Sequence, residues 1–234
     1  MSLLWLMAAT PVTATPIARN FTGAAGGTTA TASIVVTDPG VLGATEVAVL
    51  AFVCRQDRTI TPPGGGATWQ TLGPYTQGPA NVAGFNLYVF WHRGDPASWT
   101  FTPSASTSGW AWALGTYTGV KTSGNPWHST ATATGTDGTI EVPGLTSLPA
   151  NCMGVSIQCW ADSDGAGNTP TGFGSNPGSW STAGTGIKSS PEQSACHQAS
   201  LLHTGDISTA TWTLAGNTAA NLNWGARILA LEPA

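Results

Sequence analysis

Glycine and proline interrupt this chain at short intervals along its whole length. The 234 residues include 30 glycines and 16 prolines, and the segments between them are short and rich in β-branched and aromatic residues. This is the pattern of β-strands separated by turns. No stretch longer than about a dozen residues combines a helical hydrophobic period with capping residues. The sequence therefore predicts an all-β fold.

Alternation within the strand-like segments indicates how the strands pack. In segment 85–93, apolar side chains fall on both faces, which predicts a strand covered on two sides. In segment 110–118, large residues on one face alternate with small ones on the other, as expected for a strand pressed against a second sheet about 10 Å away. We therefore predict a two-sheet, jelly-roll-like β-sandwich. Its strands are expected at 33–37, 46–54, 68–72, 85–93, 99–102, 110–118, 127–134, 139–142, 152–160, 195–203, 211–214 and 224–231.

A weak internal repeat runs through the chain. The residues His-Arg-Gly-Asp at 92–95 recur as His-Thr-Gly-Asp at 203–206, and a Trp-Thr-apolar strand follows each of them at Trp99 and Trp212. The repeat predicts a pseudo-repeated fold in which equivalent strands carry equivalent residues. It pairs Trp69 with Trp180, Cys54 with Cys159, and Trp112 with Trp224.

The domain organisation follows from this repeat. We expect an N-terminal arm at 1–27 and one β-sandwich domain at 28–234, built from two similar halves at about 28–142 and 150–233. Two tandem domains are the alternative. A boundary between domains should carry a polar linker, whereas segment 143–149 is short and partly apolar, so one sandwich fits better.

The N-terminal arm contains a short apolar run, formed by Leu3, Leu4, Trp5, Leu6 and Met7. It is far shorter than the roughly 20 residues of a membrane span and lacks the cationic start of a signal peptide. An exposed run of this kind would promote aggregation unless something covered it. It fits either an arm packed on its own domain or an arm docked on a neighbouring subunit, so these residues are the interface candidates.

The low charge of the chain excludes some partners. Charged residues make up 8% of the sequence, and the net charge is −4 with only seven Lys and Arg. Nucleic acid is not an expected partner, because phosphate binding needs clustered cations. Serine, threonine, glycine and alanine must cover the surface instead, and such short side chains lose little entropy when a neighbouring protein covers them. A subunit of a larger assembly fits this composition, and a secreted sugar-binding module is the alternative.

The sequence shows no catalytic fingerprint. It has no nucleophile elbow, zinc-protease pair, P-loop or dinucleotide motif, and its 11 acids are scattered. Cys196, His197 and His203 match no common zinc spacing, and segment 162–168 begins like a calcium loop but lacks the closing acid. We expect His92 and His203 to bond nearby backbone or the following Asp at the ends of strands. We therefore expect no enzyme activity, no metal and no cofactor.

Eleven tryptophans form the largest aromatic group of the chain. Most lie within strand patterns, where core packing is expected. Trp127, Trp160 and Trp180 flank loops, where an indole can serve as a platform for a sugar ring. These three are the candidate glycan contacts of the alternative function, a carbohydrate-binding or host-receptor-binding β-sandwich module.

Six segments carry strand motifs in a fixed order, at 43–52, 67–72, 88–93, 97–102, 112–120 and 227–233. This order of motifs resembles a family of bacteriophage virion proteins that includes minor tail proteins and capsid-surface accessory proteins. The resemblance implies a structural, non-enzymatic role in a tailed-phage virion, with major capsid or tail proteins as partners. It also implies a homo-oligomer, for which a trimer is the first candidate, assembled in the host cytoplasm. The four cysteines are then expected as free thiols, and Cys152 with Cys196 is the pair to check first for a disulfide.

Overall fold

The structure is a computed structural model, and it describes residues 15–27, 31–55, 58–64, 69–77, 85–106, 109–161, 172–174, 177–188, 194–202, 205–215 and 223–234. Every regular element in these ranges is a β-strand, so the all-β prediction is confirmed. The strands are β1 (Ala18–Gly27), β2 (Ile34–Val35), β3 (Val47–Arg55), β4 (Ile60–Thr61), β5 (Gln70–Gln77), β6 (Phe85–Arg93), β7 (Thr100–Pro103), β8 (Trp110–Thr118), β9 (Trp127–Gly135), β10 (Thr139–Val142), β11 (Met153–Ala161), β12 (Gly172–Phe173), β13 (Ser181–Lys188), β14 (Ser194–Leu202), β15 (Ala210–Ala215) and β16 (Asn223–Leu231).

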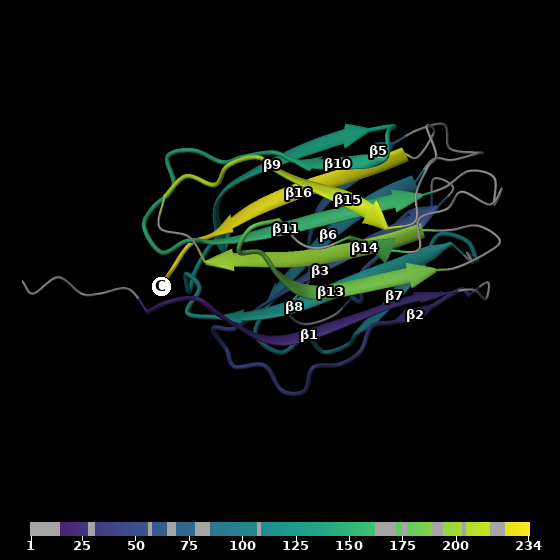
Figure 1. The fold of residues 1–234 in the computed structure, drawn as a ribbon. Helices are drawn as coiled ribbons and strands as arrows, with labels where there is room; N and C mark the ends of the chain where they lie inside the picture. The colour runs from purple at the N-terminus through teal and green to yellow at the C-terminus, as the bar shows by residue number, and fades with distance from the viewer. Residues whose placement is uncertain are drawn as a thin grey trace, which may run out of the picture.

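Two five-stranded antiparallel sheets form the centre of the molecule (Figure 1). The first has the order β1-β8-β3-β6-β5, and the second has the order β13-β14-β11-β16-β9. The sheets face each other across one apolar cluster, here called the central core. Val49 and Val89 reach it from the first sheet, and Ile157 and Leu229 reach it from the second.

Two three-stranded sheets cover the outer faces of this pair. The sheet β2-β7-β4 lies over the first five-stranded sheet, where Phe101 packs with Phe52 and Phe90 in a first outer core. The sheet β10-β15-β12 lies over the second, where Trp212 packs with Trp160 in a second outer core. The strands are thus stacked in four layers around three apolar clusters.

The four layers explain why the central strands are buried on both faces. Every residue of β3, β11 and β16 is buried, as is every residue of β6 except the last. Two-sided covering of segment 85–93 is therefore confirmed. The predicted two-sheet sandwich omits the outer layers as separate sheets, although the predicted strands 33–37, 99–102, 139–142 and 211–214 correspond to β2, β7, β10 and β15. Alternation locates a strand but does not say which sheet it joins.

The strand order is the same in two successive runs of eight strands. Adding eight to each strand number of the first five-stranded sheet reproduces the second, and the same shift converts β2-β7-β4 into β10-β15-β12. The change from one run to the next falls at 119–126. Consequently β9 and β10, which the sequence repeat placed in the first half, pair with β16 and β15 of the second run.

Strand register corrects the residue pairs of the sequence repeat. Val47 and Met153 open the central strands β3 and β11 and hold the same ladder positions, so Cys54 corresponds to Trp160. Cys54 lies in the first outer core, whereas Cys159 lies in the central core. A one-residue slip places a side chain on the opposite face of its sheet, which is why the predicted pairing of these cysteines was wrong. By the same registers, three residues of the second run hold the positions of residues in the first: Trp224 that of Trp110, Trp212 that of Phe101, and Leu201 that of His92.

Part of the predicted N-terminal arm is a strand of the fold. Residues 18–27 form β1, which pairs along its length with β8 at the edge of the first five-stranded sheet. Its alternation was hidden because small residues fill the second half of the strand. Residues 1–14, including the apolar run 3–7, lie outside the described residues.

Candidate binding pocket

The three candidate glycan-contact tryptophans lie in different environments. Trp160 is fully buried in the second outer core, so its ring offers no face to a sugar in this structure. Trp127 is half-buried and packs edge-on against Trp91, with 5.4 Å between ring centroids. Trp180, which is 8% exposed, lines a pocket. Trp180 is therefore the candidate that the geometry favours.

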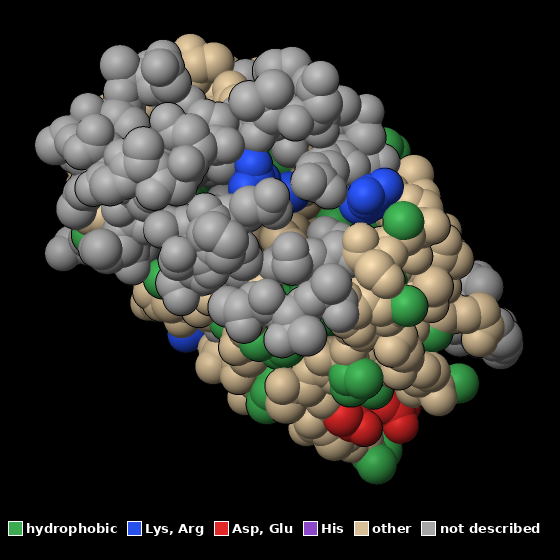
Figure 2. Space-filling view, turned by 90° about the vertical axis from the view of Figure 1, so that its right-hand side faces the viewer, with side chains coloured by type: hydrophobic (Ala, Val, Ile, Leu, Met, Phe, Trp, Pro, Cys, Tyr) green, Lys and Arg blue, Asp and Glu red, His purple; other side chains and the backbone are tan. Residues whose placement is uncertain are grey.

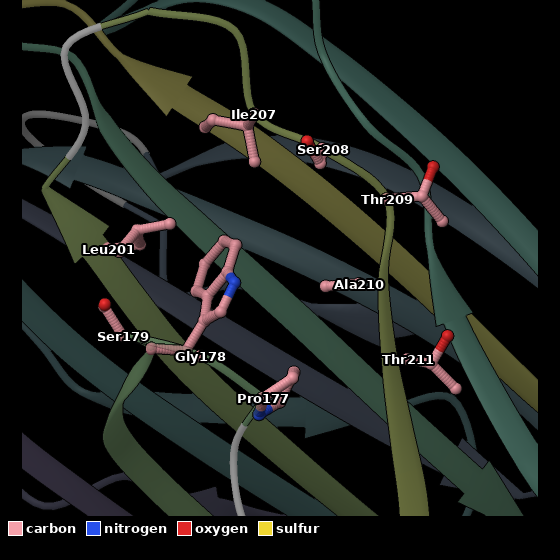
Figure 3. A pocket seen from close by; sticks show the side chains of 10 residues that line it. Pro177, Gly178, Ser179, Leu201, Ile207, Ser208, Thr209, Ala210 and Thr211 are labelled. Atoms are coloured by element: carbon pink, nitrogen blue, oxygen red, sulfur yellow. The ribbon is translucent and has the colours of Figure 1, made fainter.

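The pocket lies on the outer side of the second half, between a turn at 177–180 and the segment 207–211 (Figure 3). Its volume is about 440 Å³. Leu201 of β14 and Ala210 of β15 add apolar surface beside Trp180, while Ser208 and Thr209 add hydroxyl groups. None of the described lining residues carries a charge. The pocket therefore suits an uncharged group with substantial apolar surface.

Local backbone structure holds the two walls. The turn brings the Trp180 amide to the Pro177 carbonyl oxygen at 3.3 Å, and Gly178 within it has φ +55°, a conformation that favours glycine. On the other wall, Ile207 exchanges two backbone hydrogen bonds of 2.8 Å with Leu145. Each wall is thus held by backbone hydrogen bonds of its own.

A glycine in β11 lies close to two of the lining residues. A Cβ atom on Gly154 would lie 2.7 Å from Ile207 Cδ1 and 3.1 Å from Trp180 Cη2. Trp180 is also packed by Trp212, whose ring meets it edge-on at 5.5 Å. The absence of a side chain at 154 lets the indole of Trp180 settle close to the sheet.

The other chemistry-bearing side chains do not converge on the pocket. All four cysteines are buried and free, including the pair Cys152 and Cys196. Burial raises the pKa of the Cys159 and Cys196 thiols, which keeps them protonated. Within the described part of the chain, no group of three or more His, Cys, Asp or Glu could hold a metal ion. The calcium-like segment 162–168 and His203 lie outside the described residues.

Two histidines have structural roles. His92 Nδ1 lies 3.0 Å from the Gly94 carbonyl oxygen, which confirms the predicted backbone contact at this strand end. His197 is buried, bonds Thr185 Oγ1 through Nδ1, and stacks on Phe173. Burial lowers the pKa of His197 to about 4, so the ring is neutral at pH 7.

A polar pair links the two central sheets. In the orientation that satisfies both side chains, Tyr117 Oη of β8 donates to the Gln198 amide oxygen of β14 over 2.9 Å. The Gln198 amide nitrogen then donates to the Ala113 and Val49 carbonyl oxygens at 3.0 and 3.3 Å. Gly115 makes room for this pair, because a Cβ there would lie 2.7 Å from the Tyr117 hydroxyl. The pair therefore joins the two central sheets through hydrogen bonds.

The exterior carries few charges. Glu46, Arg55 and Arg227 are buried, and Lys121 pairs with Glu232 at 2.9 Å. On the face shown in Figure 2, the described side chains are mostly neutral, with the acidic ones gathered in one small area. Other charged residues stay exposed, among them Asp38, Asp95, Asp137, Glu141 and Asp206, so the described surface is sparsely charged, as the composition implies.

Comparisons with protein-family models, curated proteins and solved structures found no match. A search of the described residues found no helix long and apolar enough to cross a membrane.

Proposed function

We propose that this protein is a non-enzymatic structural component of a tailed-phage virion, which decorates or cements the capsid or forms part of the tail. The resemblance in the sequence points to the virion. The structure supports an assembly role through one feature, an uncharged edge strand. Partners would be major capsid or tail proteins and further copies of this chain, with a trimer as the first candidate.

The observation that carries the assembly role is β9. It lies at the edge of the second five-stranded sheet, and β16 is its only partner among the strands that the structure describes. Its nine residues contain no Lys, Arg, Asp, Glu or Pro, and Thr132 and Thr134 are exposed. Natural proteins usually protect a long edge with charges, proline or a bulge, because its free backbone groups can pair with another chain. The irregularity in the register of β9 lies at its start, at His128, and residues 129–135 pair with β16 in regular register. An edge this long and neutral fits strand addition from a neighbouring subunit.

The burial of charge supports the same proposal. Glu46 accepts hydrogen bonds from Asn20, Gly43 and Thr116, so its carboxylate serves the fold rather than the surface. Most of the described exterior consists of neutral, short side chains, and covering them costs little desolvation or side-chain entropy. A stable contact needs about 1,000 Å² of buried surface, which such an exterior can supply.

We also propose that each run of eight strands is one jelly-roll unit, so that the chain is a pseudo-repeat of two. In a jelly roll, strands one, eight, three and six form one sheet, and strands two, seven, four and five form the other. Both runs follow this order, except that the fifth strand pairs with the sixth and so joins the larger sheet. The two larger sheets then meet at the central core.

The test is to locate the protein on virions of the phage that encodes it. Gold-labelled antibody on purified particles, viewed by electron microscopy, should mark regular positions on the capsid or tail. Thr132→Lys with Thr134→Lys should abolish incorporation, because two cations on the β9 edge oppose strand addition.

The matched control is Thr122→Lys with Ser123→Lys, at exposed positions outside the strands. It adds the same charge and should leave incorporation unchanged. Absence of the protein from purified virions would reject the virion role, and equal incorporation of both lysine pairs would reject β9 as the contact.

A further inference from the structure

The ladder registers show which residues of the two halves surround equivalent tryptophans. Trp69 immediately precedes β5, and Trp180 immediately precedes β13. Phe101 pairs with Ile34, and Trp212 pairs with Ile140 at the corresponding position. The ring of Phe101 meets Trp69 edge-on at 5.4 Å and 65°, and the ring of Trp212 meets Trp180 at 5.5 Å and 68°. Register and ring geometry thus agree on the same equivalence.

Two residues before Phe101 and Trp212 in the sequence, the two halves differ. In the first half Trp99, whose carbonyl oxygen accepts from the Val36 amide, packs edge-on against Trp69 with 5.3 Å between ring centroids. In the second half the corresponding partner of Val142 is Ala210, which lines the pocket. The first half therefore fills with its own indole a space that the second half leaves open.

A second difference makes the open site less polar. In the first half, the ring centroids of His92 and Trp69 are 5.5 Å apart. In the second half, Leu201 takes the position of His92 beside Trp180. The pocket thus corresponds to the position of the Trp99 side chain in the first half, and Leu201 makes one of its walls apolar. Trp99, only 6% exposed, shows how an indole sits in such a site.

The chain itself supplies a suitable apolar group close to the pocket. Arg19 of β1 donates hydrogen bonds to the Ser181 carbonyl oxygen and to Ser200 Oγ, at 2.9 and 2.8 Å. Ser181 and Ser200 adjoin the pocket residues Trp180 and Leu201 in sequence. Ser200 pairs with Val155 on the inner face of the sheet, whereas Leu201 lies on the outer face, so a segment that leads from β1 to the pocket has to pass around the edge strand β13. Nine residues separate Trp5 from Thr15, and they can span up to about 30 Å.

We propose that the pocket over Trp180 binds the N-terminal segment 1–14 of this protein, with Trp5 inserted where the first half places Trp99. The flanking leucines and Met7 would cover the rim, which removes the apolar run from water. This assignment goes beyond a virion role and does not depend on it, because both partners belong to this chain.

The test is cross-linking in the full-length protein. Met7→Cys keeps Trp5, and Thr209→Cys places a thiol at the exposed rim of the pocket. A short bismaleimide should join these two cysteines, and the native cysteines should stay unreactive because all four are buried. The mass of the product identifies whether the segment comes from the same copy or from a second one, and either result supports the proposal.

Two variants test the occupant and the site separately. Ala210→Trp fills the pocket as Trp99 fills its counterpart, and Trp5→Ala removes the inserted ring without touching the described fold. Each should lower the cross-linking yield about ten- to a hundredfold, the factor expected for losing one buried large apolar side chain. Met7→Cys with Val41→Cys, at a 90% exposed residue of the first half, is the matched control and should not cross-link.

The proposal is overturned if the Met7 and Thr209 cysteines fail to join, or if they join equally well with Trp5→Ala. Protection of the Thr209 cysteine by a neutral monosaccharide, with no effect of Trp5→Ala on its labelling, would assign the pocket to a sugar instead.

Discussion

Trp99 and Ala210 hold the same ladder position in the two halves but have opposite packing roles. Trp99 is buried against Trp69, so Trp99→Ala should leave a cavity and lower the free energy of unfolding by about 3–5 kcal/mol. Ala210→Trp adds an indole to an existing pocket of about 440 Å³, so its effect should stay within about 1 kcal/mol. Urea unfolding of both variants measures the difference. Equal destabilisation would contradict the equivalence on which the pocket assignment rests.

His197 makes stability depend on pH at the scale of one side chain. Its pKa is lowered by burial to about 4, whereas an unfolded histidine titrates near 6.5. Between these pH values His197 is protonated in the unfolded state and neutral in the folded state. Its contribution to the free energy of unfolding is therefore fully present above pH 6.5 and is lost as the pH falls towards 4. The expected loss between pH 7.5 and pH 5 is about 2 kcal/mol.

Urea unfolding across this pH range, in wild type and two variants, measures the histidine contribution. His197→Gln should flatten the slope while keeping a side chain that can bond Thr185. His128→Gln changes an exposed histidine and should leave the slope as in wild type. Identical slopes in all three proteins would show that His197 is not the group responsible.

At the scale of elements, β13 approaches the first sheet closely because of its glycines. A Cβ on Gly186 would lie 2.3 Å from the Ala25 and Trp112 carbonyl oxygens, and these backbone atoms cannot move aside without displacing β1 and β8. Gly186→Ala should therefore cost about 3 kcal/mol of stability. Gly43→Ala is the matched control, since a Cβ there meets nothing within 4 Å and should be neutral or slightly stabilising. Thermal unfolding compares the two, and an intact Gly186→Ala protein with wild-type stability would refute the close contact.

The elements also show what the sequence could and could not predict. Strands such as β3, β6 and β16 were predictable, because nine-residue apolar runs between turns have few alternatives. β13 was missed because its close approach to β1 requires small residues that remove the alternation. Trp180 could be named as a contact from its place beside a loop. The pocket itself could not be predicted, because it depends on Ala210, the partner of Val142, holding the position of Trp99. The sequence repeat had instead aligned Trp99 with Trp212, two residues further along the chain.

At the scale of the whole molecule, the two runs of eight strands share one core. The inner faces of both five-stranded sheets are apolar, and each is covered by the other. We therefore expect the halves to unfold together in one transition, and neither half to fold alone. A protease site inserted between Ser123 and Gly124, in an exposed turn, should give two fragments that co-elute and unfold as one unit. After separation in urea, each fragment should lack a cooperative transition, because the inner face of its sheet is then exposed to water. A cooperative transition in either isolated fragment would instead identify that half as an independent domain.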